Sequence, residues 1–201
     1  LIQKDGKYHS VSWDVMYDTA LMEFRSAKQI ALVLATDATC EEVEAFKNNW
    51  VKITAVPTSM YYYNHVNSVF SSQDDGKLDE ILRMKDKTPN TRGLEAAGIT
   101  ALKNSTFDED TLVVVFRNGR AAVPTFISCK QLVCWGVFDQ KELKSLMNVK
   151  LLIPGAATIE KNGTFINCDY IKQTFSAAIN LPGETRDTCA LLVEWASKIK
   201  G

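Results

Sequence analysis

The stretch from Ser12 to Thr36 constrains the fold most, because its apolar residues recur with a helical period. Steps of three and four place one set on a single stripe of a helix: Trp13, Met16, Tyr17, Ala20, Leu21, Phe24, Ala27, Ala31 and Leu34. Ser12 can cap the first turn through its hydroxyl. The pattern predicts one long helix around which the chain packs. Residues 30–34 are apolar on every side, so Gln29–Ala35 can alternatively be read as a buried strand.

Further helices are predicted in the first half of the chain. Thr39 and Glu42 have the spacing of a capping box, and the helix that follows should end before Pro57. Helical spacing also predicts a helix over Met60–Phe70, a short one around Leu78–Met84 and a weaker one through Leu94–Ala101. The first eleven residues contain a two-residue turn signal and predict a short arm or hairpin.

The second half mixes strand and helix signals. Residues 111–116 are rich in β-branched side chains, and Asn118-Gly119 and residues 121–127 follow them, a pattern typical of a hairpin. A helix capped by the acids at 108–110 is the alternative. A second Asn-Gly turn follows an extended segment over Val149–Ile153. Residues 131–138 are apolar and fit either strand or helix. Helices are predicted over 139–147, 169–179 and 184–198.

These patterns together predict a mainly α fold. It has an N-terminal helical lobe over residues 1–104, and a mixed α+β lobe with short hairpins over residues 105–201. One continuous domain is the alternative, since 201 residues suit a single domain.

Composition narrows the class of protein. The net charge of −1 is far from the basic balance of most sequence-specific DNA binders. No apolar run is long enough for a transmembrane helix, and residues 1–4 do not resemble a signal peptide. The five cysteines are odd in number and lack CxxC spacing, which argues against a disulfide scaffold or a zinc ribbon. We therefore expect an intracellular, cytoplasmic protein in a reducing compartment that has no membrane partner.

Catalytic motifs are missing from the sequence. It has two histidines, His9 and His65, and no GxSxG, GxGxxG or Walker motif. We therefore expect no metal and no cofactor, and a non-enzymatic protein is favoured. The alternative is an enzyme whose site is assembled from distant residues, with a thiol at Cys129, Cys134 or Cys168 beside His65.

Basic residues gather near the middle of the chain. The candidates for nucleic-acid binding are Arg83, Lys85, Arg92, Arg117 and Arg120. Arginine suits phosphate because its guanidinium is planar and weakly hydrated. Acids are interspersed, so a solvated face of mixed charge is the alternative. Tyr62 and His65 are candidates for ligand binding, since aromatic rings can stack on bases or ring ligands.

Residues 35–72 resemble part of the coat proteins of flexible filamentous plant viruses. The similarity rests on Ala35-Thr36, the acidic run Glu41–Ala45 leading to Trp50, Val56-Pro57-Thr58, the aromatic-containing segment after it, and Ser71-Ser72. The resemblance implies a helical core that wraps single-stranded RNA and subunits tied together by terminal arms. The arginine-led aromatic helix followed by a Phe-Asp segment, which is more specific to that family, is absent here.

The sequence thus favours a structural or assembly protein that is not an enzyme. It would associate with itself as a homo-oligomer and could coat single-stranded RNA through its central arginines. The alternatives are the thiol enzyme described above and a module that binds a small ligand or a protein.

Overall fold

The computed structural model describes residues 1–4, 7–64, 88–103, 106–119, 127–137 and 148–199. The helices are α1 (Trp13–Ser26), α2 (Cys40–Thr54), α3 (Thr91–Ala96) and α5 (Thr188–Lys198), with a short 3-10 turn at Thr158–Glu160. The strands are β1 (Ile2–Lys4), β2 (Lys7–His9), β3 (Gln29–Ala35), β4 (Thr58–Tyr63), β5 (Thr100–Ala101), β6 (Thr111–Arg117), β7 (Gln131–Gly136), β8 (Val149–Pro154), β9 (Gly163–Ile166) and β10 (Lys172–Phe175).

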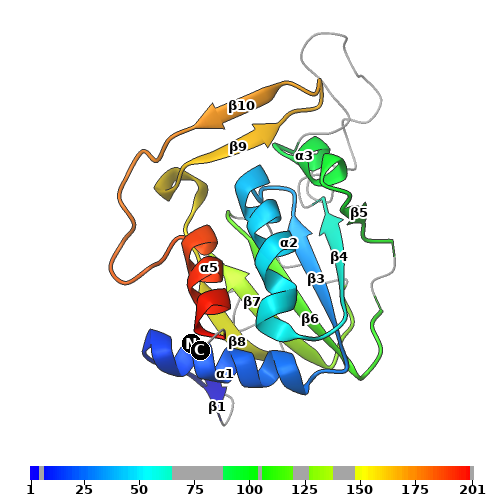
Figure 1. Ribbon diagram of the computed structural model, residues 1–201, viewed down its shortest axis with the longest axis vertical. Coiled ribbons are helices and arrows are strands. Elements are labelled where there is room, and N and C mark those ends of the chain that lie inside the picture. The colour runs from blue at the N-terminus through cyan, green and yellow to red at the C-terminus, as the bar shows by residue number, and fades with distance from the viewer. Residues whose placement is uncertain (5–6, 65–87, 104–105, 120–126, 138–147, 200–201) are drawn as a thin grey trace.

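Eight of the described strands form one sheet in the order β2-β1-β8-β7-β6-β3-β4-β5. From β5 to β8 every neighbouring pair is parallel, whereas β1 joins β8 and β2 in antiparallel pairs. Counted from β3, the parallel strands follow the order 3-2-1-4-5-6 of doubly wound sheets. The parallel strands all point toward one edge of the molecule, at the top of Figure 1.

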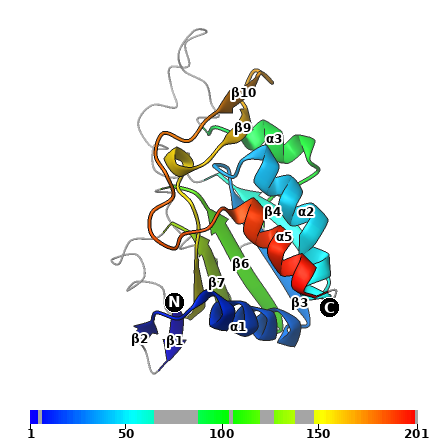
Figure 2. The same ribbon diagram turned by 60° about the vertical axis from the view of Figure 1, so that its left-hand side comes forward.

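The helices α1, α2 and α5 cover the same face of the sheet (Figure 2). Alternate residues of β3, namely Ile30, Leu32 and Leu34, face these helices, while Ala31, Val33 and Ala35 face the other side. The core under the helices is aromatic: Phe46, Trp50 and Trp135 lie with ring centroids 5.5–6.4 Å apart. Both faces of the central strands are buried, which explains why β3 and β6 are apolar without alternation.

The hairpin of β9 and β10 lies outside this sheet. The two strands pair with each other in a separate antiparallel sheet, and β9 contacts α2 and α3. In Figure 1 the hairpin crosses the edge of the molecule at which the parallel strands end. The last quarter of the chain therefore covers the carboxyl edge of the sheet.

The prediction of a mainly α fold is wrong, because the chain is mixed α/β with a large, mostly parallel sheet. The single helix predicted over 12–36 is also wrong beyond Ser26, and the alternative strand at Gln29–Ala35 is confirmed. A buried parallel strand needs no alternation, so its apolar run has the same pattern as the buried end of a helix. The sheet takes strands from both sides of the predicted lobe boundary at residue 104.

Four further predictions differ from the structure. The helix predicted over 60–70 is wrong where the structure describes it, since β4 occupies Thr58–Tyr63. The hairpin after residues 111–116 is wrong, because both neighbours of β6 are parallel strands from elsewhere in the chain. The helix over 169–179 is wrong, because β10 lies there. The helix over 94–101 ends early, since α3 spans Thr91–Ala96 and Gly98 has a φ of +80°.

Several local predictions are confirmed. The strand at 111–116, the extended segment at 149–153 and the N-terminal hairpin all form. The capping box of Thr39 and Glu42 is present, and Asp187 caps the last helix three residues after its predicted start. Residues 131–136, which fitted either strand or helix, form β7. The helices predicted over 78–84 and 139–147 lie outside the described residues.

Candidate functional site

The carboxyl ends of β3 and β6 mark the place where ligands bind in sheets of this topology. The chain leaves β3 through α2 toward β4 on one side, and it leaves β6 toward β7 on the other. Neighbouring strands whose connections run in opposite directions open a crevice between them. Polar residues follow both strands here: Thr36 and Asp37 after β3, and Asn118 after β6.

These polar side chains bind one another. The backbone N–H of Asn118 donates to Oδ1 of Asp37 over 3.2 Å, and the Asn118 amide donates to the Asp37 carbonyl over 3.1 Å. The same amide nitrogen donates to Oε2 of Glu42. Asn118 is fully buried and Asp37 nearly so. The loops that follow the two strands are thus joined directly across the crevice.

A buried ion pair completes this network. Lys161 Nζ contacts Oε1 of Glu42, and the side chains are only 2% and 1% exposed. The backbone N–H of Thr39 donates to Oε2 of Glu42 over 2.9 Å, which closes the capping box of α2. Burial raises the pKa of Glu42, while the charge of Lys161 acts in the opposite direction. The cation comes from the segment between β8 and β9, so the crevice is filled by the chain itself.

Two further side chains fasten β9 over this network. Glu41 accepts from the backbone N–H of Thr164 over 2.9 Å and from its hydroxyl over 2.6 Å. Asn90, which is fully buried, accepts from the N–H of Ile166 over 2.8 Å and donates to the Ala38 carbonyl over 2.6 Å. A Cβ on Gly163 would lie 2.5 Å from Thr39 Cγ2, so the strand sits directly on the start of α2.

Four of the five thiols are poor candidates for nucleophiles, and the fifth, Cys168, is half-buried between β9 and β10. Burial raises the pKa of Cys40 and Cys129, and it raises the pKa of Cys189 to about 12. A reactive thiol needs a lowered pKa, because the thiolate is the nucleophile. Cys134 is buried in the sheet, and His65, its proposed partner, lies outside the described residues. In the parts of the chain that the structure describes, no group of three or more His, Cys, Asp or Glu side chains could hold a metal ion.

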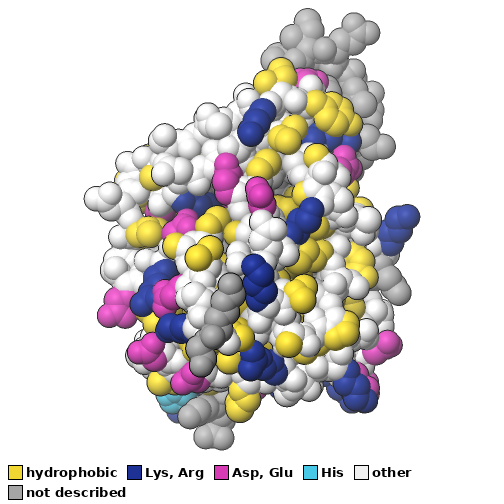
Figure 3. Space-filling model, viewed as in Figure 1, with side chains coloured by type: hydrophobic (Ala, Val, Ile, Leu, Met, Phe, Trp, Pro, Cys, Tyr) yellow, Lys and Arg dark blue, Asp and Glu magenta, His cyan; other side chains and the backbone are white. Residues whose placement is uncertain are grey.

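The residues predicted to bind nucleic acid do not form a described groove. Arg117 is fully buried at the end of β6. Arg92 pairs with Glu95 at 2.7 Å and lies over the ring of Tyr170, 5.0 Å from its centroid. Arg83, Lys85 and Arg120 lie outside the described residues. Across the face shown in Figure 3, acidic and basic side chains are interspersed rather than gathered by sign.

The predicted ligand-binding pair is also not brought together in the described structure. Tyr62 lies on β4, packs against the core under the helices and donates to Glu95 over 2.9 Å. Its neighbours Tyr61 and Tyr63 face the opposite side of the sheet, as the alternation of a strand requires. His65 lies just beyond the described end of this segment.

Sequence reasoning missed the residues that meet at the crevice: Asp37, Glu42, Asn90, Asn118 and Lys161. A signal for two of them was present, because Asp37 and Asn118 each come two residues after the end of an apolar run. Had both runs been read as parallel strands, their carboxyl ends would have placed these side chains at one edge. Lys161 and Asn90 carry no such signal, since each comes from a distant connection.

Comparison with protein-family models gives no match for this chain, and comparison with curated proteins gives none either. The coat-protein resemblance therefore stays a prediction, although the helical core that it implies is not the fold observed. None of the helices in the described residues has the length and apolar character needed to cross a membrane.

Proposed function

We propose that this chain is a non-enzymatic structural domain that associates with a second copy of itself. The observation that carries the proposal is an exposed, uncharged surface on the segment that leads from the end of β10 toward α5. Residues 173–183 contain no charged side chain, and we call them the uncharged strap. Every residue of the strap is exposed or half-buried.

Apolar side chains make this surface suitable for a protein contact. Ile179 in the strap is 50% exposed, and Ile159 beside it is 57% exposed. The two segments are joined through the Ile159 carbonyl, which accepts from the N–H groups of Ala178 over 2.8 Å and Ile179 over 3.2 Å. Neighbouring exposed apolar side chains of this kind are typical of interaction surfaces.

A second copy is the occupant that the charges favour. The net charge of −1 places almost no repulsion between two copies, and the strap adds none where they would meet. The strap includes the last three residues of β10, so a two-fold contact through the strap also brings the hairpins of the two copies close together.

The closed crevice supports a role without catalysis. The place where a doubly wound sheet would receive a cofactor is occupied by Glu42, Lys161 and Asn118. A ligand entering there would have to displace β9 and leave a buried ion pair unsatisfied. The proposal does not extend to RNA, because, of the predicted contacts that the structure describes, Arg92 is paired with Glu95 and Arg117 is buried.

Light scattering after size exclusion tests the proposal over a range of protein concentrations. The unaltered chain should show a mass that rises toward the dimer with concentration. Ile179→Asp places a charge in the strap, so this variant should remain monomeric at every concentration. Val193→Asp is the matched control, because Val193 is similarly exposed, at 57%, but lies on α5. A monomer at every concentration, or equal dissociation by both variants, would refute self-association through the strap.

A further inference from the structure

A cavity of about 330 Å³ lies at the carboxyl ends of β7 and β8, beside the start of α1. It is separate from the Glu42–Lys161 network, none of whose residues line it. Pockets for small ligands begin near this size, at roughly 300 Å³, and they favour the carboxyl edges of α/β sheets. The cavity therefore has room for a compact molecule.

The walls of the cavity are mostly apolar. Val11, Met16, Ile153 and Pro154 contribute carbon surface, and Trp13 closes one side with its indole ring. Gly136 also lines the cavity, at the end of β7. Such a cavity suits the hydrocarbon part of a ligand.

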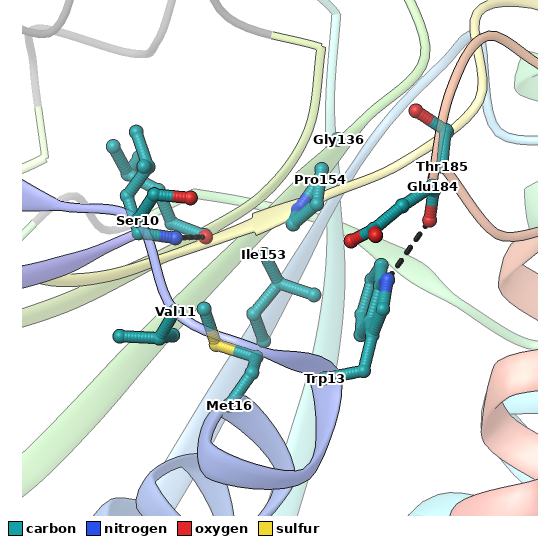
Figure 4. Close-up of a pocket in the computed structure, with 11 residues that line it drawn as sticks. Ser10, Val11, Trp13, Met16, Gly136, Ile153, Pro154, Glu184 and Thr185 are labelled. Carbon is teal, nitrogen blue, oxygen red and sulfur yellow. Dashed lines mark hydrogen bonds between the residues drawn. The ribbon is translucent and has the colours of Figure 1, made fainter.

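Among the described residues that line the cavity, two groups are ionisable: the α-amino group of Leu1, which donates to the Leu152 carbonyl over 2.7 Å and whose pKa burial lowers to about 6, and the side chain of Glu184. Figure 4 shows its carboxylate directed toward the space between Pro154 and the Trp13 ring. No ion pair or hydrogen bond to this carboxylate is formed within the described residues, although the Glu184 backbone carbonyl accepts from the Trp13 indole over 2.8 Å. That hydrogen bond fixes the ring relative to the acid.

The Trp13 ring already makes a cation–π contact, with Arg186. The Arg186 guanidinium lies 5.1 Å from the ring centroid, and Glu194 holds it at 2.6 Å. Arg186 does not line the cavity. An indole ring is the best aromatic partner for a cation, through its negative π face.

We propose that this cavity binds a small primary amine with an apolar body. The ammonium group lies between the Glu184 carboxylate and the Trp13 ring, and the hydrocarbon part fills the space lined by Val11, Met16 and Ile153. The carboxylate repels an anionic ligand of the same shape. A neutral ligand gains the apolar contacts but neither the ion pair nor the cation–π contact.

The test uses three probes with the same six-carbon skeleton and different polar ends: hexylammonium, hexanol and hexanoate. Binding is followed at pH 7 by the indole N–H resonance of Trp13 in nitrogen-15 NMR spectra, assigned with Trp13→Phe. The other three tryptophans are fully buried, so their resonances are internal references. We expect hexylammonium to bind about tenfold more tightly than hexanol, from one exposed ion pair and one cation–π contact. Hexanoate should bind more weakly than either.

Three variants separate the contributions. Glu184→Gln removes the ion pair and should weaken hexylammonium binding several-fold, leaving only the cation–π contact as its advantage over hexanol. Asp169→Asn is the charge-matched control at the hairpin turn. Thr185→Phe fills the cavity from its rim and should weaken all three probes while circular dichroism shows an intact fold. The proposal is overturned if the probes bind equally, if hexanoate binds most tightly, if Glu184→Gln changes nothing, or if no probe moves the Trp13 resonance. These outcomes are independent of self-association, which the strap variants measure.

Discussion

Replacing Lys161 by methionine should destabilise the fold by about 3 kcal/mol at pH 7. Removing one partner of a buried ion pair costs roughly 3–5 kcal/mol, because the remaining charge stays uncompensated. Glu42 is 1% exposed, so water cannot take the place of Lys161. The backbone of Thr39 and the amide of Asn118 still donate to the carboxylate, which places the expected loss at the lower end of the range.

The double variant Glu42→Gln/Lys161→Met isolates the pairing. The glutamine keeps an acceptor for the Thr39 N–H, and no charge remains buried, so the double variant should lose only about 1–2 kcal/mol. Glu42→Gln alone leaves the Lys161 ammonium unpaired and should cost about as much as Lys161→Met. The single losses should therefore sum to several kcal/mol more than the loss of the double variant.

The pH dependence provides an independent check. Burial raises the pKa of Glu42, and removing Lys161 raises it further. An acid whose folded pKa is raised binds protons more readily in the folded state, so stability falls as pH rises above the ordinary value of 4.5. The cost of Lys161→Met should be full above the folded pKa and shrink as pH falls toward 4.5.

Urea unfolding monitored by tryptophan fluorescence supplies these free energies, since Trp50, Trp135 and Trp195 are buried. Low protein concentration removes any contribution from association. The reasoning is refuted if Lys161→Met loses less than about 1 kcal/mol, or if its loss does not diminish at acid pH.

Three other predictions concern the edge that the hairpin covers and the end of β7. Burial alone would raise the pKa of Glu41, but its hydrogen bonds to Thr164 and the backbone outweigh burial and lower it. The ionised Glu41 therefore contributes to the free energy of unfolding above pH 4.5, and this contribution is lost as pH falls through the folded pKa. Because the side chain is exposed, the contribution is below about 1 kcal/mol. Glu41→Gln should abolish this loss of stability at acid pH, measured by urea unfolding between pH 3 and 7. Asn90→Ala removes the acceptor for the Ile166 N–H and the donor to the Ala38 carbonyl, so it should lower the free energy of unfolding by about 2–3 kcal/mol. It should also speed amide hydrogen exchange in β9, and unchanged exchange would show that Asn90 does not hold the hairpin. Gly136→Ala should prevent folding at 37 °C, because φ is +133° and the new Cβ would lie 1.8 Å from the Arg117 carbonyl oxygen. Circular dichroism checks this, and a folded variant would show that β7 can shift away from β6.

Structural features that depend on interactions within a few residues could be predicted from the sequence. The capping box at Thr39 and the periodicity of α1 and α5 depend on spacing within one helix, and these features are found in the structure. The strand β3 was ambiguous because a run such as Ile30–Leu34 is equally apolar in a buried helix and in a central parallel strand. What decided between them is pairing with β4 and β6, which pattern reading within a short window does not detect.

The candidate site was less accessible to sequence reasoning for the same reason. Glu42 reads as a helix cap and Lys161 as a surface cation when each is taken with its sequence neighbours. Their pairing depends on the path of the chain after β8, which carries Lys161 back over the start of α2. The central arginines looked similar in the sequence, but burial separates Arg117 from Arg92.

The Glu42–Lys161 pair also bears on how the chain is made. Synthesis runs from the N-terminus, so α2 and the strands up to β8 leave the ribosome before Lys161 does. Until then Glu42 has no cation to accompany it into the interior, and the centre of the sheet cannot close without burying a lone carboxylate. A nascent chain stopped before residue 161 should therefore remain open to proteases, and one extended through β9 should become resistant. Folding is therefore completed only after the last quarter of the chain has been synthesised.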